Sequence, residues 1–432
     1  MPRALYADSS INIKELYRLV QQQQQQIEKQ QRQVEALRNL VETQQQQLNH
    51  RINDTNKRVN KINKSSNVKV SLKNGLRLNS GDGEFSFRLG GRIHTDLAFY
   101  GEDKTEMGSG TALRRARLFA SGRLFHNWIF RSEIDFAEDG DVGPRDVWLG
   151  YTGLGRYTFK IGNFQEPFSL EEMTSSNVIT FMERALPNIF APDYHIGAGV
   201  STYGADWSWA AGFFGETTGN KDDKVDDGWA FAGRSTFAPY HSKDRVFHLG
   251  LATEYRETNS ENKVRFRSRP ESYVTNRRLV DTRTIHGVDS SLKLGGELAA
   301  VYGPLSFQGE YIGTMVDRQE DEDLYFDGWY LYGSWFITGE SRRYIVKRGK
   351  FGSIRPLHKF GAWELGIRYS TLDLNDRDIA GGKENNLTLG VNWYPNSNVR
   401  FMTNYIRADI RPNRDRQNES LNIFQMRAQL NF

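Results

Sequence analysis

The sequence predicts an all-β transmembrane barrel of about 16 antiparallel strands, preceded by a long α-helical coiled coil. Three observations carry this prediction. Apolar residues recur every seven positions in residues 12–62, apolar and polar residues alternate from residue 68 onward, and the last alternating stretch ends on Phe432. Because the two periods belong to different kinds of element, we expect two domains: residues 1–66 form the coiled coil and linker, and residues 67–432 form the barrel.

Composition narrows the class of protein. The chain has 432 residues, a net charge of +4, 40 Gly and no Cys, with a mean hydropathy of −0.65. No apolar run of about 18 residues occurs, which excludes a helical membrane protein, whereas barrel strands stay polar on average because half of their residues face the lumen. The absence of Cys excludes thiol catalysis and disulfides. The small net charge does not indicate a nucleic-acid partner.

The N-terminus carries a weak targeting signal. Met1–Ala7 lacks the hydrophobic stretch of a secretory signal, although Ala4-Leu5-Tyr6-Ala7 resembles the end of a cleavage site. Two interpretations remain open: a signal was removed before this numbering begins, or the protein stays inside the cell.

The first domain has a heptad repeat. A spacing of 3.5 residues predicts a left-handed coiled coil, and about 50 helical residues would extend about 75 Å. Glutamine at Gln23, Gln30 and Gln44 weakens the seam, so we expect another part of the chain to help it oligomerise. A disordered Gln-rich tract is the alternative interpretation. The predicted apolar seam comprises Leu16, Val20, Ile27, Val34, Leu37, Val41 and Leu48.

The second domain shows a period of two. Phe85–Leu89, Trp363–Tyr369 and Phe424–Phe432 each place apolar side chains on one face and polar side chains on the other. Short turn signals alternate with long polar segments such as 258–281, as in bacterial outer-membrane barrels with short periplasmic turns. A soluble β-sandwich or propeller would also alternate. The terminal Phe432 and the aromatic residues near expected strand ends favour the barrel; these are Trp128, Trp148, Tyr151, Tyr157, Trp393 and Tyr394.

Several stretches together resemble one known family, the phosphate-selective porins O and P. The resemblance extends over residues 68–432 and implies a trimeric 16-stranded barrel whose third loop folds inward. It implies an outer-membrane location. The family's best-known members lack a long coiled coil, so the expected periplasmic coiled coil rests on the heptads of this chain alone. The matching stretches are 84–92, 164–170 with Thr174-Ser175-Ser176, 181–184, 361–364 and 389–394.

The resemblance also implies roles for individual arginines. Arg265, Arg267 and Arg269 alternate along the chain and resemble the family's loop ladder for anions. Arg88 and Arg355 stand where the family carries lysines near the periplasmic mouth. The residues that resemble its constriction arginines are Arg92, Arg114, Arg115 and Arg184.

The chain also departs from the family pattern. Glu172 replaces a lysine just before the Thr-Ser-Ser segment, and Arg145 replaces an acidic residue. Arg117 replaces a central aromatic residue, and Ile345 replaces a periplasmic lysine. A charge reversal at a confined site has a large effect because water screens it poorly. These departures argue against a high-affinity phosphate site and leave a general anion preference.

Arginine chemistry agrees with that preference. The guanidinium group pairs bidentately with oxyanions, stays charged and is weakly hydrated, and a row of modest sites lets an anion enter and leave. We expect Arg115 and Arg117 on one face toward the lumen, with Arg114 near the strand edge. Two structural alternatives to pore lining remain open. Arg114, Arg115 and Arg117 would pair with carboxylates across the barrel wall or bind lipopolysaccharide, and the 265–269 ladder would be exposed at the surface without contacting the pore.

The third loop is expected to span 166–197. Thr174, Ser175, Ser176 and Glu183 would line the constriction beside Arg184, with Glu172 nearby. In the alternative interpretation, Glu183 and Arg184 brace the loop against the wall.

No catalytic, metal or cofactor site is expected. The eight His are scattered, and the acidic segments 221–227 and 319–323 lack the spacing of a calcium loop, although they would attract divalent ions that bridge lipopolysaccharide. Two functions remain. The first is a trimeric, arginine-lined channel for passive diffusion of phosphate, other oxyanions or small carboxylates. The second is an envelope tether whose coiled coil contacts peptidoglycan.

Overall fold

The computed structural model describes residues 13–66, 68–72, 75–138, 141–218, 225–412 and 417–432. The expected cleavage-site tail Ala4–Ala7 and most of the acidic segment 221–227 lie outside the described residues. Contacts divide the chain into two units, a helical one and a β one, which are described separately.

The helical unit is one continuous helix, α1 (Ile13–Ser66), of 54 residues. No Gly or Pro interrupts it, and Gln, Glu, Lys, Arg and Leu are good helix formers. The expected seam residues lie along it and are 52–60% exposed, since a single chain offers no partner for them. The long N-terminal helix is confirmed, and its assembly into a coiled coil stays a prediction. None of the described helices is long and apolar enough to cross a bilayer.

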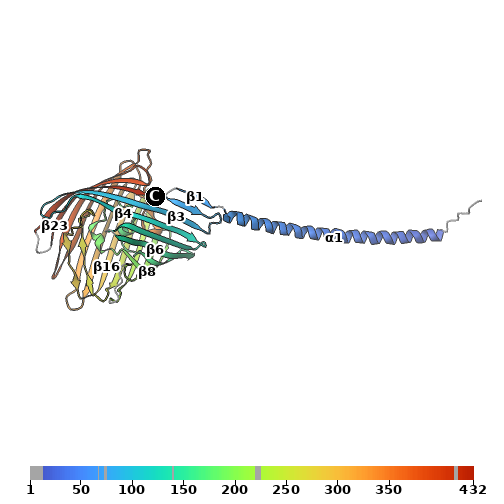
Figure 1. Cartoon of the computed structure of the whole chain (residues 1–432), viewed down its shortest axis with the longest axis horizontal. Helices are drawn as coiled ribbons and strands as arrows, with labels where there is room; N and C mark the ends of the chain where they lie inside the picture. Colours follow the sequence, from blue (N-terminus) through green and yellow to red (C-terminus); the bar gives the residue numbers. More distant parts are fainter. Residues whose placement is uncertain (1–12, 67, 73–74, 139–140, 219–224, 413–416) are drawn as a thin grey trace, which may run out of the picture. The chain divides into compact units, whose positions relative to one another are not determined.

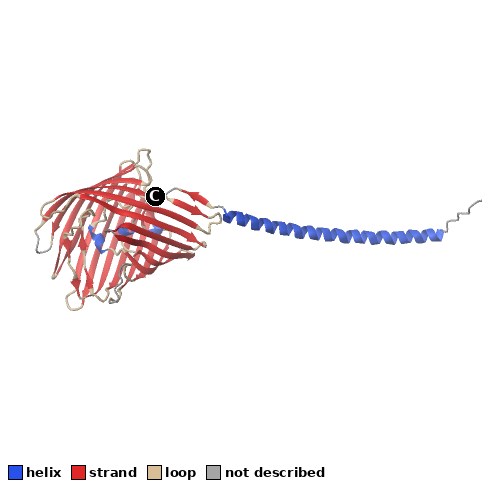
Figure 2. Cartoon of the chain, in the orientation of Figure 1, coloured by secondary structure: helices blue, strands red, loops and turns tan. Residues whose placement is uncertain are grey.

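The β unit is a closed antiparallel barrel of 16 strands, as predicted (Figures 1 and 2). β24 pairs with β3 and closes it. In chain order the strands are β3 (Ser86–Gly101), β4 (Gly110–Leu124), β5 (Trp128–Glu138), β6 (Asp141–Leu154), β7 (Tyr157–Gln165), β8 (Tyr194–Tyr203), β9 (Trp207–Phe214), β10 (Trp229–His241), β11 (Arg245–Glu257), β16 (Val288–Tyr302), β17 (Leu305–Arg318), β18 (Leu324–Phe336), β21 (Ala362–Asp376), β22 (Ile379–Tyr394), β23 (Val399–Arg411) and β24 (Glu419–Asn431).

A small hairpin extends the sheet next to the β3–β24 pairing that closes the barrel. β1 (Lys69–Ser71) pairs with β2 (Leu76–Asn79), and β2 pairs with the first residues of β3, where β24 no longer does. Phe432 exchanges two backbone hydrogen bonds of 3.0 Å with Gly91. A Cβ atom at Gly90 would lie 2.5 Å from the Phe432 carbonyl oxygen, so this crossing requires glycine.

Side chains alternate between the two faces of the barrel wall. In β24, Phe424 and Met426 are exposed on the outside, whereas Gln425 and Arg427 are buried inside. Exposed aromatic residues gather at strand ends on the outer face, which is the pattern of a membrane interface. On the rim where β3 begins and β24 ends, the terminal rim, they include Trp128, Tyr157, Trp207, Tyr302, Trp335 and Trp363. The half-buried Trp393 stacks beside Trp363, with ring centres 5.8 Å apart. Two aromatics expected there, Trp148 and Tyr394, instead lie on the inner face; Tyr394 is 7% exposed and donates to Glu364.

Three inserted segments fill much of the lumen. Loop 166–193 follows β7 and contains α2 (Leu170–Met173) and η1 (Leu186–Phe190). Loop 258–287 follows β11 and contains β12 (Lys263–Val264), β13 (Arg267–Ser268), β14 (Val280–Asp281) and β15 (Ile285–His286). Segment 337–361 enters from the terminal rim and contains β19 (Tyr344–Ile345), η2 (Val346–Arg348) and β20 (Lys350–Phe351).

A hydrophobic core inside the barrel holds two of these segments. Phe190 and Phe266, one from each loop, pack in one cluster with the inner-wall residues Ile312, Leu372 and Ile406. Burying such side chains contributes roughly 1.5–3 kcal/mol each. The loops are therefore part of the folded core and narrow the passage that remains.

Candidate functional site: the arginine-rich lumen

A β-bulge directs consecutive arginines into the lumen. Arg117 pairs with Arg92 and Arg115 pairs with His94, but the next pair is Leu113 with Thr95, so Arg114 is an extra residue. A bulge places two residues of one strand opposite one residue of its partner. As a result Arg114, Arg115 and Arg117 all reach inner-face carboxylates, and Arg114 does not stay at the strand edge.

Glu183 of loop 166–193 collects three arginines from the wall. Its carboxylate lies 2.9 Å from Arg114 Nε, 3.9 Å from Arg115 Nη2 and 2.5 Å from Arg427 Nη2. Burial alone would raise the pKa of Glu183, but these arginines outweigh it and hold that pKa well below its usual value. Arg427 also donates to both oxygens of Asp96 at 2.7 Å. This Glu183 cluster fixes the loop to β3, β4 and β24.

A second cluster surrounds Glu133 of β5. Arg92 Nη2 lies 3.2 Å from its carboxylate and Arg117 Nη1 lies 3.3 Å from it, and Arg131 also donates to it. Arg117 Nε contacts Asp135 at 2.7 Å, and Arg131 Nε contacts Asp146 at 3.1 Å. In this Glu133 cluster, three guanidinium groups therefore converge on one carboxylate.

The same cluster touches the tip of loop 166–193. Arg92 Nη1 donates to Ser176 Oγ at 3.0 Å and to Ser175 Oγ at 3.4 Å. The predicted serine and arginine residues are thus brought together on one side of the lumen. Whether they contact a permeating anion stays a prediction.

Sequence reasoning missed the acidic half of this cluster. Arg131-Ser-Glu-Ile-Asp135 alternates charged residues with uncharged ones, so period two places all three charges on one face. The attached Asp146 and the buried Arg427 were also missed. The alternation in β5 could have predicted that Arg131, Glu133 and Asp135 face the lumen together.

Arg145 and Lys160 extend the cationic wall along β6 and β7. Arg145 Nη1 lies 3.1 Å from Asp193, whose side chain is 58% exposed. Lys160 Nζ lies 4.5 Å from the centre of the Trp148 ring. Positively and negatively charged side chains therefore both line the lumen beside β6 and β7.

Other predicted loop residues hold the loop itself together. Glu172 is 4% exposed, accepts from Gln165 at 2.6 Å and Asn188 at 2.9 Å, and pairs with Arg184 at 3.2 Å. Arg184 also donates to the carbonyl oxygens of residues 171, 172 and 174. Thr174 is 1% exposed. The structure ends the loop at residue 193 rather than 197, because β8 begins at Tyr194.

In loop 258–287 the three arginines predicted to form a ladder alternate with buried residues, and their role as a ladder for anions stays a prediction. Arg265 and Arg267 are exposed and Arg269 is half-buried, while the intervening Phe266 and Ser268 are buried. Arg265 pairs with Asp281. The Tyr273 ring lies between two arginines, 3.8 Å from the Arg269 guanidinium carbon and 3.5 Å from that of Arg114. This stack joins the last arginine of the ladder to the bulged arginine of β4.

The two remaining predicted arginines lie toward the terminal rim. Arg88, on the inner face of β3, lies 4.9 Å from the Phe119 ring centre. Arg355 is an exposed residue of segment 337–361. In the same segment Lys350, which is half-buried, donates to the Met173 carbonyl at 2.6 Å. Burial, followed by the neighbouring cations Arg348 and Lys160, lowers the pKa of Lys350 to about 7.

The charges around the two clusters nearly balance. The two clusters contain six arginines (Arg92, Arg114, Arg115, Arg117, Arg131 and Arg427) and five carboxylates (Asp96, Glu133, Asp135, Asp146 and Glu183). Adjacent groups add three cations (Arg88, Arg145 and Lys160) and one carboxylate (Asp193), and the nearby Arg184 and Glu172 pair with each other and cancel. The excess of three positive charges sits in a confined space where interactions between charges are stronger than in bulk water. Such a lining attracts anions without leaving most arginines unpaired.

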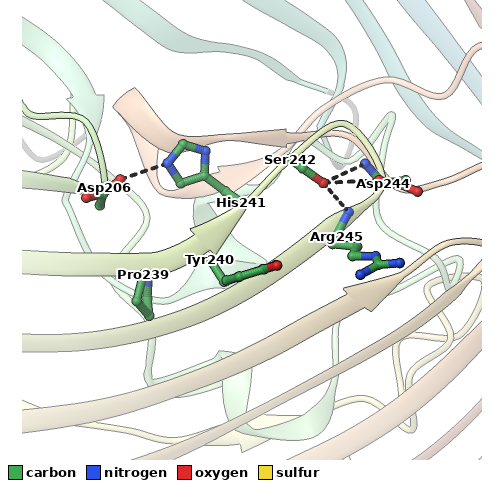
Figure 3. Close-up of a pocket in the computed structure, with 7 residues that line it drawn as sticks. All are labelled: Asp206, Pro239, Tyr240, His241, Ser242, Asp244 and Arg245. Atoms are coloured by element: carbon green, nitrogen blue, oxygen red, sulfur yellow. Dashed lines mark hydrogen bonds and ion pairs between the residues drawn. The ribbon is translucent and has the colours of Figure 1, made fainter.

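A separate hollow of about 560 Å³ lies at the terminal rim (Figure 3), lined by Asp206, Pro239, Tyr240, His241, Ser242, Asp244 and Arg245. His241 Nε2 contacts Asp206 at 2.9 Å, and Ser242 Oγ donates to Asp244 at 3.0 Å. These contacts stabilise two neighbouring turns, and the hollow lies apart from both arginine clusters.

A closed barrel with an apolar, aromatic-flanked outer face and a polar lumen narrowed by inserted loops defines an outer-membrane porin. Porins are channel proteins rather than enzymes. The chain belongs to the family "Phosphate-selective porin O and P", whose model matches residues 87–432. The family predicted from the sequence motifs is confirmed.

Individual relatives agree with this assignment. The chain is 29% identical over 387 residues to Porin O of Pseudomonas aeruginosa, covering 79% of this chain and 87% of that protein. It is 28% identical over 361 residues to an uncharacterized protein of Caulobacter vibrioides, covering 79% and 72% of the two chains.

Solved structures share the fold at low identity. The anion-selective porin from Comamonas acidovorans matches with a TM-score of 0.55 at 12% identity, covering 81% of this chain and all of that one. The outer-membrane channel DcaP of Acinetobacter baumannii matches with a TM-score of 0.53 at 10% identity, covering 81% and 97%.

Proposed function

We propose that the protein is a trimeric, arginine-lined channel for passive diffusion of small anions, including phosphate, other oxyanions and small carboxylates. The observation that carries this proposal is the excess of three positive charges around the Glu133 and Glu183 clusters. Guanidinium groups at this density favour anions over cations, and because most are already paired, each site is modest. The family name and the anion-selective porin among the similar structures support the same direction.

A trimer is supported from two sides. One similar structure, OmpT of Vibrio cholerae, is described in a trimer form, with a TM-score of 0.50. The exposed heptad seam of α1 would be covered if neighbouring chains supplied two more helices. We place this barrel among outer-membrane lipids, with lipopolysaccharide on one leaflet and α1 in the periplasm.

Planar-bilayer recording tests the proposed function. Single channels of the purified protein are measured in potassium chloride, potassium phosphate and potassium acetate at equal potassium concentration. We expect an open channel in all three salts whose conductance changes with the anion. A closed channel, or a conductance that follows potassium alone, would contradict the proposal.

A second candidate, an envelope tether, is favoured by the charge of α1. Arg51, Lys57 and Arg58 outnumber Asp54 near its C-terminal end, and peptidoglycan is a carboxylate-bearing polymer. Purified peptidoglycan sedimented with the full chain and with a chain lacking residues 13–66 tests this role. Equal sedimentation of both proteins would exclude α1 as the contact.

A further inference from the structure

The Glu133 cluster has the geometry of an occupied oxyanion site. Arg92, Arg117 and Arg131 all donate to this one carboxylate, and arginines pair in the same way with phosphate or carboxylate ligands. The ligand in this case is a side chain of the channel itself. We propose that Glu133 acts as a tethered competitor for permeating oxyanions, which keeps their residence short; this inference rests on the proposed anion channel.

The surroundings of Glu133 hold the arginines in place independently of it. Asp135 binds Arg117 Nε at 2.7 Å, Asp146 lies 3.1 Å from Arg131 Nε, and Ser176 accepts from Arg92 at 3.0 Å. Each guanidinium group therefore has a second partner. Removal of the Glu133 charge would leave three oriented cationic donors around one uncharged side chain.

Accessibility differs between the carboxylate and its partners. The Glu133 side chain is 1% exposed, whereas those of Arg92 and Arg117 are 10% exposed and that of Arg131 is 22% exposed. A permeating anion therefore meets the arginines first and competes with Glu133 for their N–H groups. An attached group competes at an effective concentration of about millimolar or higher, so dilute free phosphate displaces it poorly.

Charge balance points in the same direction. The three arginines face three carboxylates, Glu133, Asp135 and Asp146, so this part of the lumen is neutral overall. Neutralising Glu133 would leave one net positive charge at the centre of three guanidinium groups. Glu183 also holds three arginines, but it belongs to an inserted loop, so its loss would also move that loop.

The test is block of chloride current by phosphate in the Glu133→Gln channel. Single-channel chloride current is recorded while potassium phosphate is added, and the concentration that halves the current is compared with the wild-type value. We expect it to fall at least tenfold, or about 1.4 kcal/mol. Glu254→Gln is the matched control, because Glu254 is equally buried and pairs with Arg256 at 2.8 Å and Lys293 at 2.6 Å on β11 and β16. The control should leave block unchanged.

Two results would overturn the inference: an unchanged blocking concentration in Glu133→Gln, or an equal decrease in Glu254→Gln, which would show a general charge effect. If Glu133→Gln does not fold, Glu133→Asp retains the charge and withdraws the carboxylate by one methylene group. In Glu133→Asp the phosphate concentration that halves the current should then fall by a smaller factor, and an unchanged concentration would again overturn the inference. Failure of the proposed function is distinguished by the wild type, whose current would then follow potassium.

Discussion

The contact that should matter most for the inserted loop 166–193 is Arg427. Its side chain is fully buried, donates twice to Asp96 at 2.7 Å, contacts Glu183 at 2.5 Å and donates to the Met182 carbonyl. Arg427→Met keeps an unbranched side chain and removes every one of these donors. The loop then loses this contact with β24 and keeps the weaker one from Gln429 to the Asn177 carbonyl at 3.2 Å, and Asp96 stays behind as a buried carboxylate.

The size of the effect follows from burial. Removing one partner of a buried ion pair costs about 3–5 kcal/mol because the other charge is left uncompensated. Arg400 provides the comparison: it is also buried and donates to the Ile179 carbonyl of the loop at 2.7 Å and to Gln429 of β24 at 2.8 Å, but it pairs with no carboxylate among the described residues. Arg400→Met removes hydrogen bonds but leaves no buried carboxylate without its partner, so it should cost less than Arg427→Met.

Urea unfolding of the barrel in lipid vesicles measures this cost. We expect the free energy of unfolding to fall by about 3–5 kcal/mol in Arg427→Met, and single-channel current to become noisier as the loop detaches. Asp96→Asn combined with Arg427→Met should recover part of the loss, because it removes the stranded charge. An unfolding free energy equal to that of wild type, together with a quiet channel, would refute the role of Arg427 as the loop anchor.

Three further predictions follow from other parts of the structure. The pKa of Lys350 is lowered to about 7, so this side chain gains its positive charge as the pH falls through 7. Anion selectivity, measured by reversal potential, should therefore rise as the pH is lowered from 8.5 to 6, and Lys350→Met should abolish this rise. Glu172→Gln should change the chloride-to-potassium permeability ratio by less than about twofold, since Glu172 is buried within its loop against Arg184; a larger change would place its charge in the passage. Gln23→Leu combined with Gln30→Leu should raise the melting temperature of a peptide of residues 13–66, followed by its helical circular dichroism signal. An unchanged melting temperature would argue against coiled-coil pairing through the predicted seam.

Much of the fold could be predicted from the periodic spacing of apolar residues in the sequence. The period of two in stretches such as Phe424–Phe432 predicts which face of each strand meets lipid, and the uninterrupted stretch 13–66 predicts the helix. Both signals are local, because they depend on side chains a few residues apart.

The docking of the inserted segments is non-local and could not be predicted in this way. Glu183 reaches Arg427 across 244 residues of sequence, and Arg114 faces the lumen only because a bulge adds one residue to β4. Glu172 appeared as a reversed charge in the passage, yet its carboxylate turns into the loop, where Gln165 and Asn188 satisfy it. Such placements depend on contacts between strands distant in sequence.

The central claim is that the lumen selects anions. Its most direct test is the reversal potential of the wild-type channel between two concentrations of potassium chloride at pH 7, where the excess of three positive charges around the clusters should act. We predict a reversal potential displaced toward the equilibrium potential of chloride. A displacement toward that of potassium would contradict the claim.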